Sequence, residues 1–142
     1  MSQENQYAAE IRAAVDAWHD ALTSKDVGRI AAFFTDDAVV FDVKAPLRLA
    51  GIDAVRRVFA EALPYFPEKF GVETRDRVAH AGAEVASAHW LFRFTGFPPD
   101  HTFWMRSTAT FVRRAGAWRI AHAHLSLPMA SENGDILFTN DL

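Results

Sequence analysis

Three ionisable side chains lie in segments that are otherwise apolar, and these residues are the best candidates for chemistry. Asp42 lies between Phe41 and Val43 in a short β-branched segment. A carboxylate there either faces solvent from an edge strand or is buried, and burial makes it a stronger proton acceptor. His122 and His124 are two residues apart, so both side chains point to the same face of a strand. Together the three residues could supply a base and an acid for proton transfer.

The histidine pair allows two other interpretations. It could bind a metal, but two His at this spacing fix no third ligand, and we predict no metal site. It could also fill space in the core while hydrogen-bonded to its neighbours, which is the commoner role of a core histidine. Ser107 and Ser126, expected on the same face, favour a polar lining in an otherwise apolar place.

The N-terminal half of the chain predicts helices that could position these residues. Apolar residues recur at steps of three and four from Tyr7 to Leu22, and Asp26 is a suitable N-cap for a short second helix. Pro64 closes a third apolar stripe. We expect helices at about residues 7–24, 26–34 and 53–63, with Thr35-Asp36-Asp37 as a break, a strand at 38–43, and a loop at 44–51.

From residue 71 the apolar period changes to two, which is typical of strands. We expect strands near residues 71–80, 84–95, 102–114 and 117–127. Helices followed by antiparallel strands indicate an α+β fold with the helices on one face of the sheet. In the tail, Asn133-Gly134 is a turn signal, and the apolar residues at 136–138 need cover from the domain or from a second subunit.

The last two strands allow side chains to be assigned to faces. If Ala115-Gly116 forms a two-residue hairpin turn, Arg114 pairs with Ala117 and the pairing continues residue by residue. The register then places His122 opposite Ala109, His124 opposite Ser107, and Ser126 opposite Met105. With Phe111, these side chains should form one pocket lining, and His89 on the preceding strand could join them. An odd shift in pairing would move one strand's set to the opposite face.

The opposite face predicts a homodimer. It should carry Trp104, Val112 and Leu125, so the sheet is apolar on both faces. A single layer of helices covers one face, and an uncovered apolar face of this size normally marks an interface. The alternative cover is the tail from Met129, folded back over that face.

Composition narrows the classes of function. The chain has 142 residues, a net charge of −3, no Cys, 12 Phe and 4 Trp. That charge gives no reason to expect nucleic acid or an anionic membrane as partner, and the lack of Cys excludes disulfides and thiol chemistry. With no signal-peptide pattern and no apolar run of ~20 residues, a cytoplasmic location is expected. The many aromatic residues favour a lined cavity over a solid core that is rich in Phe.

The order of elements and two segments, residues 34–42 and 116–128, resemble the NTF2-like superfamily, and within it the SnoaL-like branch related to ketosteroid isomerase. The resemblance covers about residues 7–128 and implies an α+β cone. In that cone a curved antiparallel sheet and three N-terminal helices enclose a pocket. It also implies one domain over 1–142, with a tail at 129–142, that is usually dimeric. Members include isomerases, polyketide cyclases, dehydratases, epoxide hydrolases and noncatalytic domains.

Carried over residue by residue, the resemblance is partial. Asp42 falls where ketosteroid isomerases keep their general base, while Trp18 and Ala109 fall where those enzymes keep the Tyr and Asp of the oxyanion hole. Ala109 donates nothing, and losing such a donor costs about 10²–10³ in rate, so steroid isomerisation is not expected. Scytalone dehydratase uses an Asp and two His, which Asp42, His122 and His124 could reproduce, although its Tyr pair has no match here.

We therefore expect a proton-transfer enzyme without cofactor, of isomerase, cyclase or dehydratase type. Its substrate should be a small, largely apolar carbonyl or hydroxyl compound. The predicted catalytic residues are Asp42, His122 and His124, in a pocket lined by Trp18, His89, Met105, Ser107, Ala109, Phe111 and Ser126. The alternative is a noncatalytic ligand-binding or assembly domain, in which the same polar residues form a satisfied network.

Overall fold

The computed structural model describes residues 3–140, and the side chains of residues 6–140. The elements are α1 (Gln3–Thr23), α2 (Val27–Ala31), β1 (Phe34–Phe41), β2 (Leu49–Ala50), α3 (Ile52–Ala62), β3 (Gly71–Ala81), β4 (Val85–Thr95), β5 (Met105–Arg114) and β6 (Ala117–Ser126). Short 3₁₀ turns follow α3 and β4, namely η1 (Leu63–Tyr65) and η2 (Pro99–His101). The predicted helices and the predicted strands are present close to their expected bounds.

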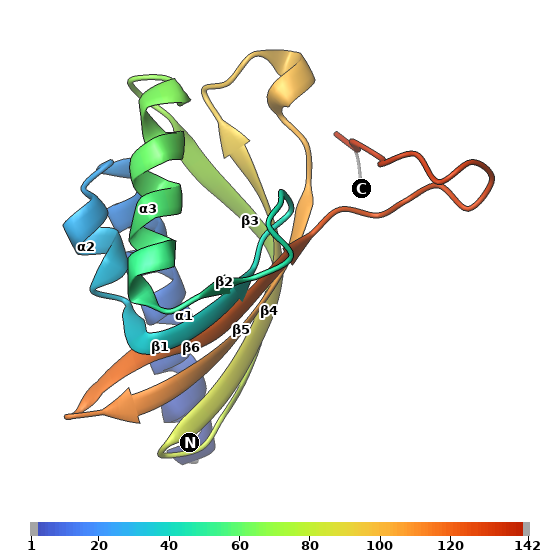
Figure 1. The fold of residues 1–142 in the computed structure, drawn as a ribbon. Helices are drawn as coiled ribbons and strands as arrows, with labels where there is room; N and C mark the ends of the chain where they lie inside the picture. The colour runs from blue at the N-terminus through green and yellow to red at the C-terminus, as the bar shows by residue number, and fades with distance from the viewer. Residues whose placement is uncertain (1–2, 141–142) are drawn as a thin grey trace.

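The strands form one open, curved sheet in the order β2-β1-β6-β5-β4-β3 (Figure 1). Neighbouring strands are antiparallel except β1 and β6, which are parallel. The expectation of a purely antiparallel sheet is therefore wrong. The chain between β1 and β6 is long enough to return in the same direction, as a parallel pair requires. In the described part of the chain, all three α-helices lie on the concave side of the sheet.

Two local expectations in the N-terminal half need correction. Residues 35–37, expected as a break, lie within β1, where they interrupt the pairing with β6: Phe34 pairs with Ile120, and regular pairing resumes only at Val39. Leu49 and Ala50, expected in a loop, form β2 against Val40 and Val39. At β2, pairing with a neighbouring strand overrides the weak β preference of the segment itself.

The N-cap at Asp26 is present as expected. Its carboxylate Oδ1 accepts a hydrogen bond from the backbone N–H of Arg29 at 3.1 Å, which satisfies one of the free donors at the start of α2. The link between α1 and α2 therefore ends at Asp26, and α2 begins at the next residue.

The hairpin of β5 and β6 follows the predicted register for its first half only. Arg114 pairs with Ala117 and Phe111 pairs with Ile120, so the two-residue turn is confirmed. Beyond that point β6 contains one extra residue, Ala121, and the pairing shifts by one. His122 therefore faces Thr110, His124 faces Thr108 and Ser126 faces Arg106, in place of Ala109, Ser107 and Met105. A β-bulge of this kind moves every later side chain of the strand to the other face.

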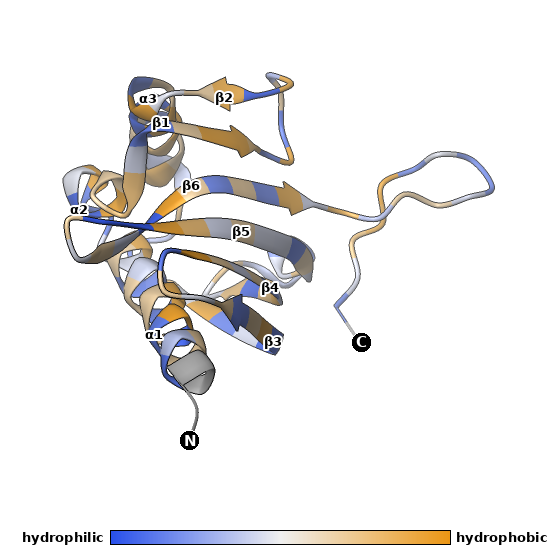
Figure 2. Ribbon diagram, turned by 90° about the horizontal axis from the view of Figure 1, so that it is seen from below, coloured by the Kyte–Doolittle hydropathy of each residue, from blue (hydrophilic) through white to orange (hydrophobic). Residues whose placement is uncertain are grey.

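The core lies between the concave face and the helices. The largest fully buried side chains are Phe111, Ile11, Ile30, Ile120 and Val55. Hydrophilic and hydrophobic bands alternate along β6 (Figure 2), as expected for a strand with one face in the core. Among the described residues, no helix is long and apolar enough to cross a membrane.

The tail forms an arm that extends from the body of the domain (Figure 1). Met129 and Ile136 form an isolated antiparallel bridge, and the predicted turn at Asn133-Gly134 lies between them. The end of the arm returns to Trp104, whose indole N–H donates to the carbonyl oxygen of Asn140 at 3.1 Å. The arm is therefore fastened at both ends, while the side chains of its middle part are exposed.

Candidate functional site

A cavity of about 500 Å³ lies between the concave face of the sheet and helices α1 and α3. Its walls are mainly apolar, and many of them are aromatic. Phe66, Phe94 and Phe97 have ring centroids 5.1 to 5.4 Å apart and form part of this wall. The ionisable residues that line the cavity are His19, Asp42, Lys44 and His101. Few polar groups in an apolar cavity of this size are typical of a small-molecule site.

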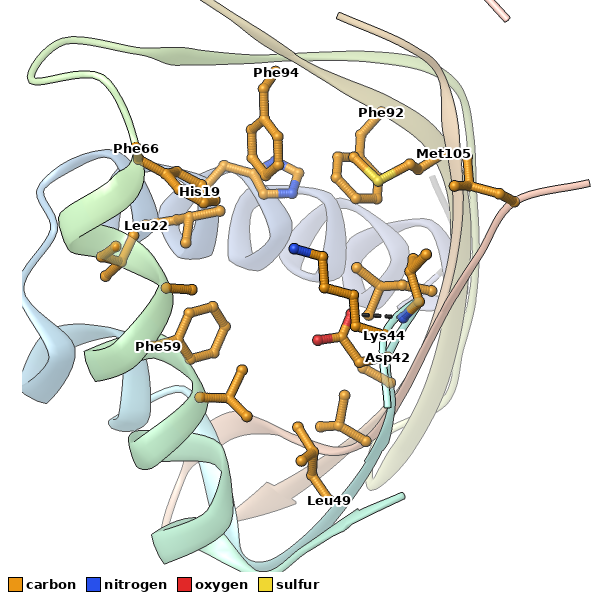
Figure 3. Close-up of a pocket in the computed structure, with 18 of the residues that line it drawn as sticks. His19, Leu22, Asp42, Lys44, Leu49, Phe59, Phe66, Phe92, Phe94 and Met105 are labelled. Atoms are coloured by element: carbon orange, nitrogen blue, oxygen red, sulfur yellow. Dashed lines mark hydrogen bonds between the residues drawn. The ribbon is translucent and has the colours of Figure 1, made fainter. Parts of the chain in front are cut away.

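Asp42 follows the last residue of β1 and lines the cavity (Figure 3). Alternation along β1 places it on the same face as buried Val40, as the sequence indicates. Its Oδ1 accepts a hydrogen bond from the backbone N–H of Val43 at 2.7 Å, and the carboxyl group is half-buried. One carboxylate oxygen is thus held by the backbone, while the group faces the cavity.

His19 on α1 is the cavity residue that the sequence analysis missed. Its side chain is 7% exposed and lies against the rings of Trp18, Trp90 and Phe92, with centroids 5.2 to 6.4 Å away. Its ring makes no hydrogen bond with the described residues and points into the cavity (Figure 3). The signal for it is helical spacing, because His19 is four residues after Val15.

The protonation state of His19 follows from its surroundings. Burial lowers the pKa of His19 from 6.5 to about 4, with a further lowering by the charge of Arg77 and a smaller opposing effect of Asp16. The ring is therefore neutral at pH 7, with one nitrogen that donates and one that accepts. It can form a hydrogen bond to a ligand without carrying a charge into an apolar cavity.

Several predicted pocket residues lie on the concave side. Trp18 and Met105 line the cavity. Ser107, Ala109 and Phe111 are buried on the same face but are not among the residues that line it. The predicted lining residues of β5 therefore lie on the expected face of the sheet, but only Met105, at the start of the strand, reaches the cavity.

The predicted β6 half of the lining lies on the convex face, because of the bulge at Ala121. His122 Nδ1–H donates to the carbonyl oxygen of Val39 at 2.7 Å, and its ring packs edge-on against Phe41. His124 also packs against Phe41. The structure therefore does not bring either histidine together with Asp42, and their predicted place in the pocket is wrong.

The two remaining predicted lining residues also lie on the convex face. His89 pairs with Thr108 and is exposed, and Ser126 accepts a hydrogen bond from Arg106 Nε at 3.0 Å. The inner positions of β6 are taken instead by Ala123, Leu125 and Leu127. Leu125 was expected on the outer face and is corrected by the same shift. Among the described residues, no group of three or more His, Cys, Asp or Glu could hold a metal ion.

Comparison with solved structures finds the same architecture elsewhere. An NTF2-like protein of unknown function from Pseudomonas putida is 30% identical, with a TM-score of 0.87 over 100% of this chain and 98% of that one. A ketosteroid isomerase-like protein from Erwinia carotovora atroseptica is 21% identical, with a TM-score of 0.69 over 84% of this chain and 94% of that one. A comparison with curated proteins gives no match.

The family comparison agrees with the fold. The profile of the SnoaL-like domain matches residues 11–130, from α1 to the start of the arm. This range contains every residue that lines the cavity except those of the arm. The chain therefore belongs to the SnoaL-like family, within the NTF2-like superfamily.

Proposed function

We propose that this protein is a cofactor-independent enzyme that moves protons on a small, largely apolar carbonyl or hydroxyl compound, as an isomerase, cyclase or dehydratase. The observation that carries the proposal is the presence of Asp42 and His19 in one apolar cavity (Figure 3). A carboxylate can accept a proton there, and a neutral imidazole can donate a hydrogen bond. His19 takes the part of the acid, for which the sequence suggests the pair His122 and His124.

In the proposed reaction, the Asp42 carboxylate removes a proton from a carbon next to a carbonyl group. The electron pair of that C–H bond forms a C=C bond, and the carbonyl π pair moves onto oxygen. His19 donates its ring N–H to this oxyanion, and it does so as a neutral group because its pKa is about 4. In an isomerisation the substrate has a C=C bond beside the deprotonated carbon; the carbonyl π bond re-forms, the C=C bond moves next to the carbonyl group, and protonated Asp42 gives its proton to the far carbon. In a dehydration the carbonyl π bond re-forms while the C–O bond of a β-hydroxyl group breaks, and protonated Asp42 gives its proton to the departing hydroxide, which leaves as water.

The family membership supports this class of reaction without identifying the substrate. The solved structure from Erwinia carotovora atroseptica is described as ketosteroid isomerase-like, and ketosteroid isomerases use a carboxylate base in an apolar site. Asp42 is the carboxylate at the corresponding place in this chain. The donors of that site differ here, since Trp18 and Ala109 stand at the two positions, and His19 is a donor of another kind.

The alternative is a noncatalytic ligand-binding or assembly domain, and one observation favours it. Asp42 accepts the N–H of Val43, and His122 donates to Val39, so both groups have partners within the chain. A network in which every polar atom is paired is structural. His19 favours an enzyme instead, because its pKa is lowered by burial and its ring forms no hydrogen bond with the described residues.

A proton-exchange assay tests the proposal without knowledge of the natural substrate. Apolar ketones with acidic α-hydrogens are incubated with the protein in D₂O, and loss of the α-hydrogen signal is followed by NMR. We expect exchange with the wild type, loss of most of it in Asp42→Asn, and a decrease of about 10²-fold in His19→Phe. His124→Gln should retain exchange, because its side chain lies on the convex face.

Two results would contradict the proposal that this protein is an enzyme. Exchange in Asp42→Asn at the wild-type rate would show that Asp42 is not the base. The absence of exchange for every ketone that binds in the cavity would favour the binding domain. Loss of exchange in His124→Gln with the fold intact would return the chemistry to the histidine pair.

We also propose that the protein is a homodimer formed through the convex face of the sheet. In the described chain that face carries no helix (Figure 1), and the arm extends away from it. Phe41 is 38% exposed there beside His122 and His124, and Val78 is 37% exposed. A second copy is the natural cover for such a face, because the same patch is offered by both chains.

Light scattering with Phe41→Asp tests the dimer. We expect a dimer for the wild type at micromolar concentration and a monomer for the variant, since each chain would bury an unpaired carboxylate in the interface. Leu47→Asp is the matched control, because Leu47 is exposed in the β1–β2 loop. A monomeric wild type would refute the proposal.

A further inference from the structure

The cavity contains a cationic side chain that the proposed proton transfer does not use. Lys44 is two residues after Asp42, where the chain leaves β1 for the loop to β2. Its side chain extends into the cavity (Figure 3), and it is one of the lining residues. Within the part of the chain that the structure describes, its ammonium group forms no ion pair and no hydrogen bond.

The other ionisable lining groups leave the charge of Lys44 uncompensated. His19 is neutral at pH 7, and His101 is paired with Asp100 at 3.0 Å. Asp42 is the nearest carboxylate in sequence, but it forms no ion pair with Lys44. Lys44 is exposed at the wall of the cavity, so its ammonium group is open to solvent and has no carboxylate partner among the described residues.

Ligand binding changes this balance. A neutral apolar ligand would displace water from the Lys44 ammonium group and offer nothing in return, which opposes binding. A ligand with an anionic group next to its apolar body would replace that water with a charge-assisted hydrogen bond. Asp42 would repel an anion placed directly against it, so the anionic group must lie on the Lys44 side of the cavity, with the reacting carbon toward Asp42.

We infer that the ligand of this cavity is an amphipathic acid, an apolar oxo acid or hydroxy acid whose carboxylate is bound by Lys44. The inference rests on the proposed function, which places the reacting carbonyl or hydroxyl group between Asp42 and His19. Lys44 would add a second point at which the protein holds the ligand. With the carboxylate held at Lys44, the ligand can present only the carbons near that end to the Asp42 carboxylate.

Three probes with one apolar body and different charge test the inference. They are 2-naphthoate, 2-naphthalenemethanol and 2-naphthylmethylammonium, each titrated calorimetrically into the wild type. We expect naphthoate to bind about tenfold more tightly than the alcohol, and the ammonium compound more weakly than either. Lys44→Met should remove the preference for naphthoate by weakening its binding, and the alcohol should bind this variant at least as tightly as the wild type, because no ammonium group loses its water. Lys44→Arg, which keeps the charge, should retain the preference.

Lys69→Met is the matched control, because Lys69 is an exposed lysine that does not line the cavity. It should keep the wild-type preference. The inference is overturned if the wild type binds naphthoate no better than the alcohol, or if Lys44→Met retains the preference. If none of the probes binds, the apolar ligand site of the proposed function fails as well. If the alcohol binds without any preference for the anion, the inference about Lys44 alone fails.

Discussion

The buried histidine on α1 should give the stability of this protein a pH dependence that can be assigned to one residue. His19 is 7% exposed, and its pKa falls from 6.5 in the unfolded chain to about 4 in the fold, chiefly through burial. Between these two values the unfolded state binds a proton that the folded state refuses. Stability is therefore highest above pH 6.5 and is lost as the pH falls toward 4.

The size of the effect follows from the two pKa values. One unit of difference corresponds to about 1.4 kcal/mol, so the full loss attributable to His19 is about 3 kcal/mol. Between pH 7 and pH 5 the expected loss is about 2 kcal/mol, because at pH 5 the unfolded histidine is almost fully protonated and the folded one almost neutral. The positive charge of Arg77 lowers the pKa of His19 further, and Asp16, which forms an ion pair with Arg77 at 2.9 Å, opposes this to a smaller extent.

Urea unfolding of the wild type and of His19→Phe at pH 7, 6 and 5, at one protein concentration, measures this loss. The free energy of unfolding of the wild type should fall by about 2 kcal/mol more than that of H19F over this range. Phe keeps the aromatic contacts with Trp18 and Phe92 and has no proton to bind. His101→Gln is the control, since His101 is exposed, and it should follow the wild type. Equal pH dependence of the wild type and H19F would refute the assignment.

Two further predictions concern the frame of the cavity, and both are measured by urea or thermal unfolding. Gly96→Ala should cost about 2 kcal/mol or more, because its φ is +85° and an added Cβ would lie 2.8 Å from the carbonyl oxygen of Lys69. The control Gly116→Ala, with φ of +78° and nothing within 4 Å of the Cβ, should cost only about 1 kcal/mol. Phe111→Ala should cost about 3–5 kcal/mol, because the ring is 1% exposed in the core, and an equal effect of all three changes would contradict this account.

Much of the fold could be predicted because its local signals agree with its tertiary contacts. The stripe of α1, the cap at Asp26 and the turn at Ala115-Gly116 each act within a few residues, and all three are present. The face of Asp42 also follows from simple alternation, since Val40 is buried two residues earlier. The strand β2 could not be predicted in this way, because two residues gain their conformation only by pairing with β1.

The site was predicted only in part, because regular alternation was assumed along the whole of β6, and the bulge at Ala121 breaks that alternation. The apolar pattern itself contains the signal of the bulge. Trp118 and Ile120 are in one phase, while Ala123 and Leu125 are in the other. A change of phase within one strand indicates an extra residue, and a bulge is the usual way to accommodate it. His19 could not be predicted in the same way, because its burial depends on contacts with Trp90 and Phe92 of β4, which are distant in sequence.

The bulge at Ala121 decides which side chains of β6 line the cavity. A regular β6 would place His122 and His124 inside and leave Ala123 and Leu125 outside, which would give the sheet side of the cavity two titratable groups. With the bulge, the β6 wall is apolar, and the ionisable groups come from α1, from the chain that follows β1, and from η2. Under the proposed function, a ligand would turn its polar atoms toward His19, Asp42 and Lys44 and its apolar body toward the sheet. Because the walls exclude other partners, each of these few polar contacts has a larger effect on binding and orientation than it would in water.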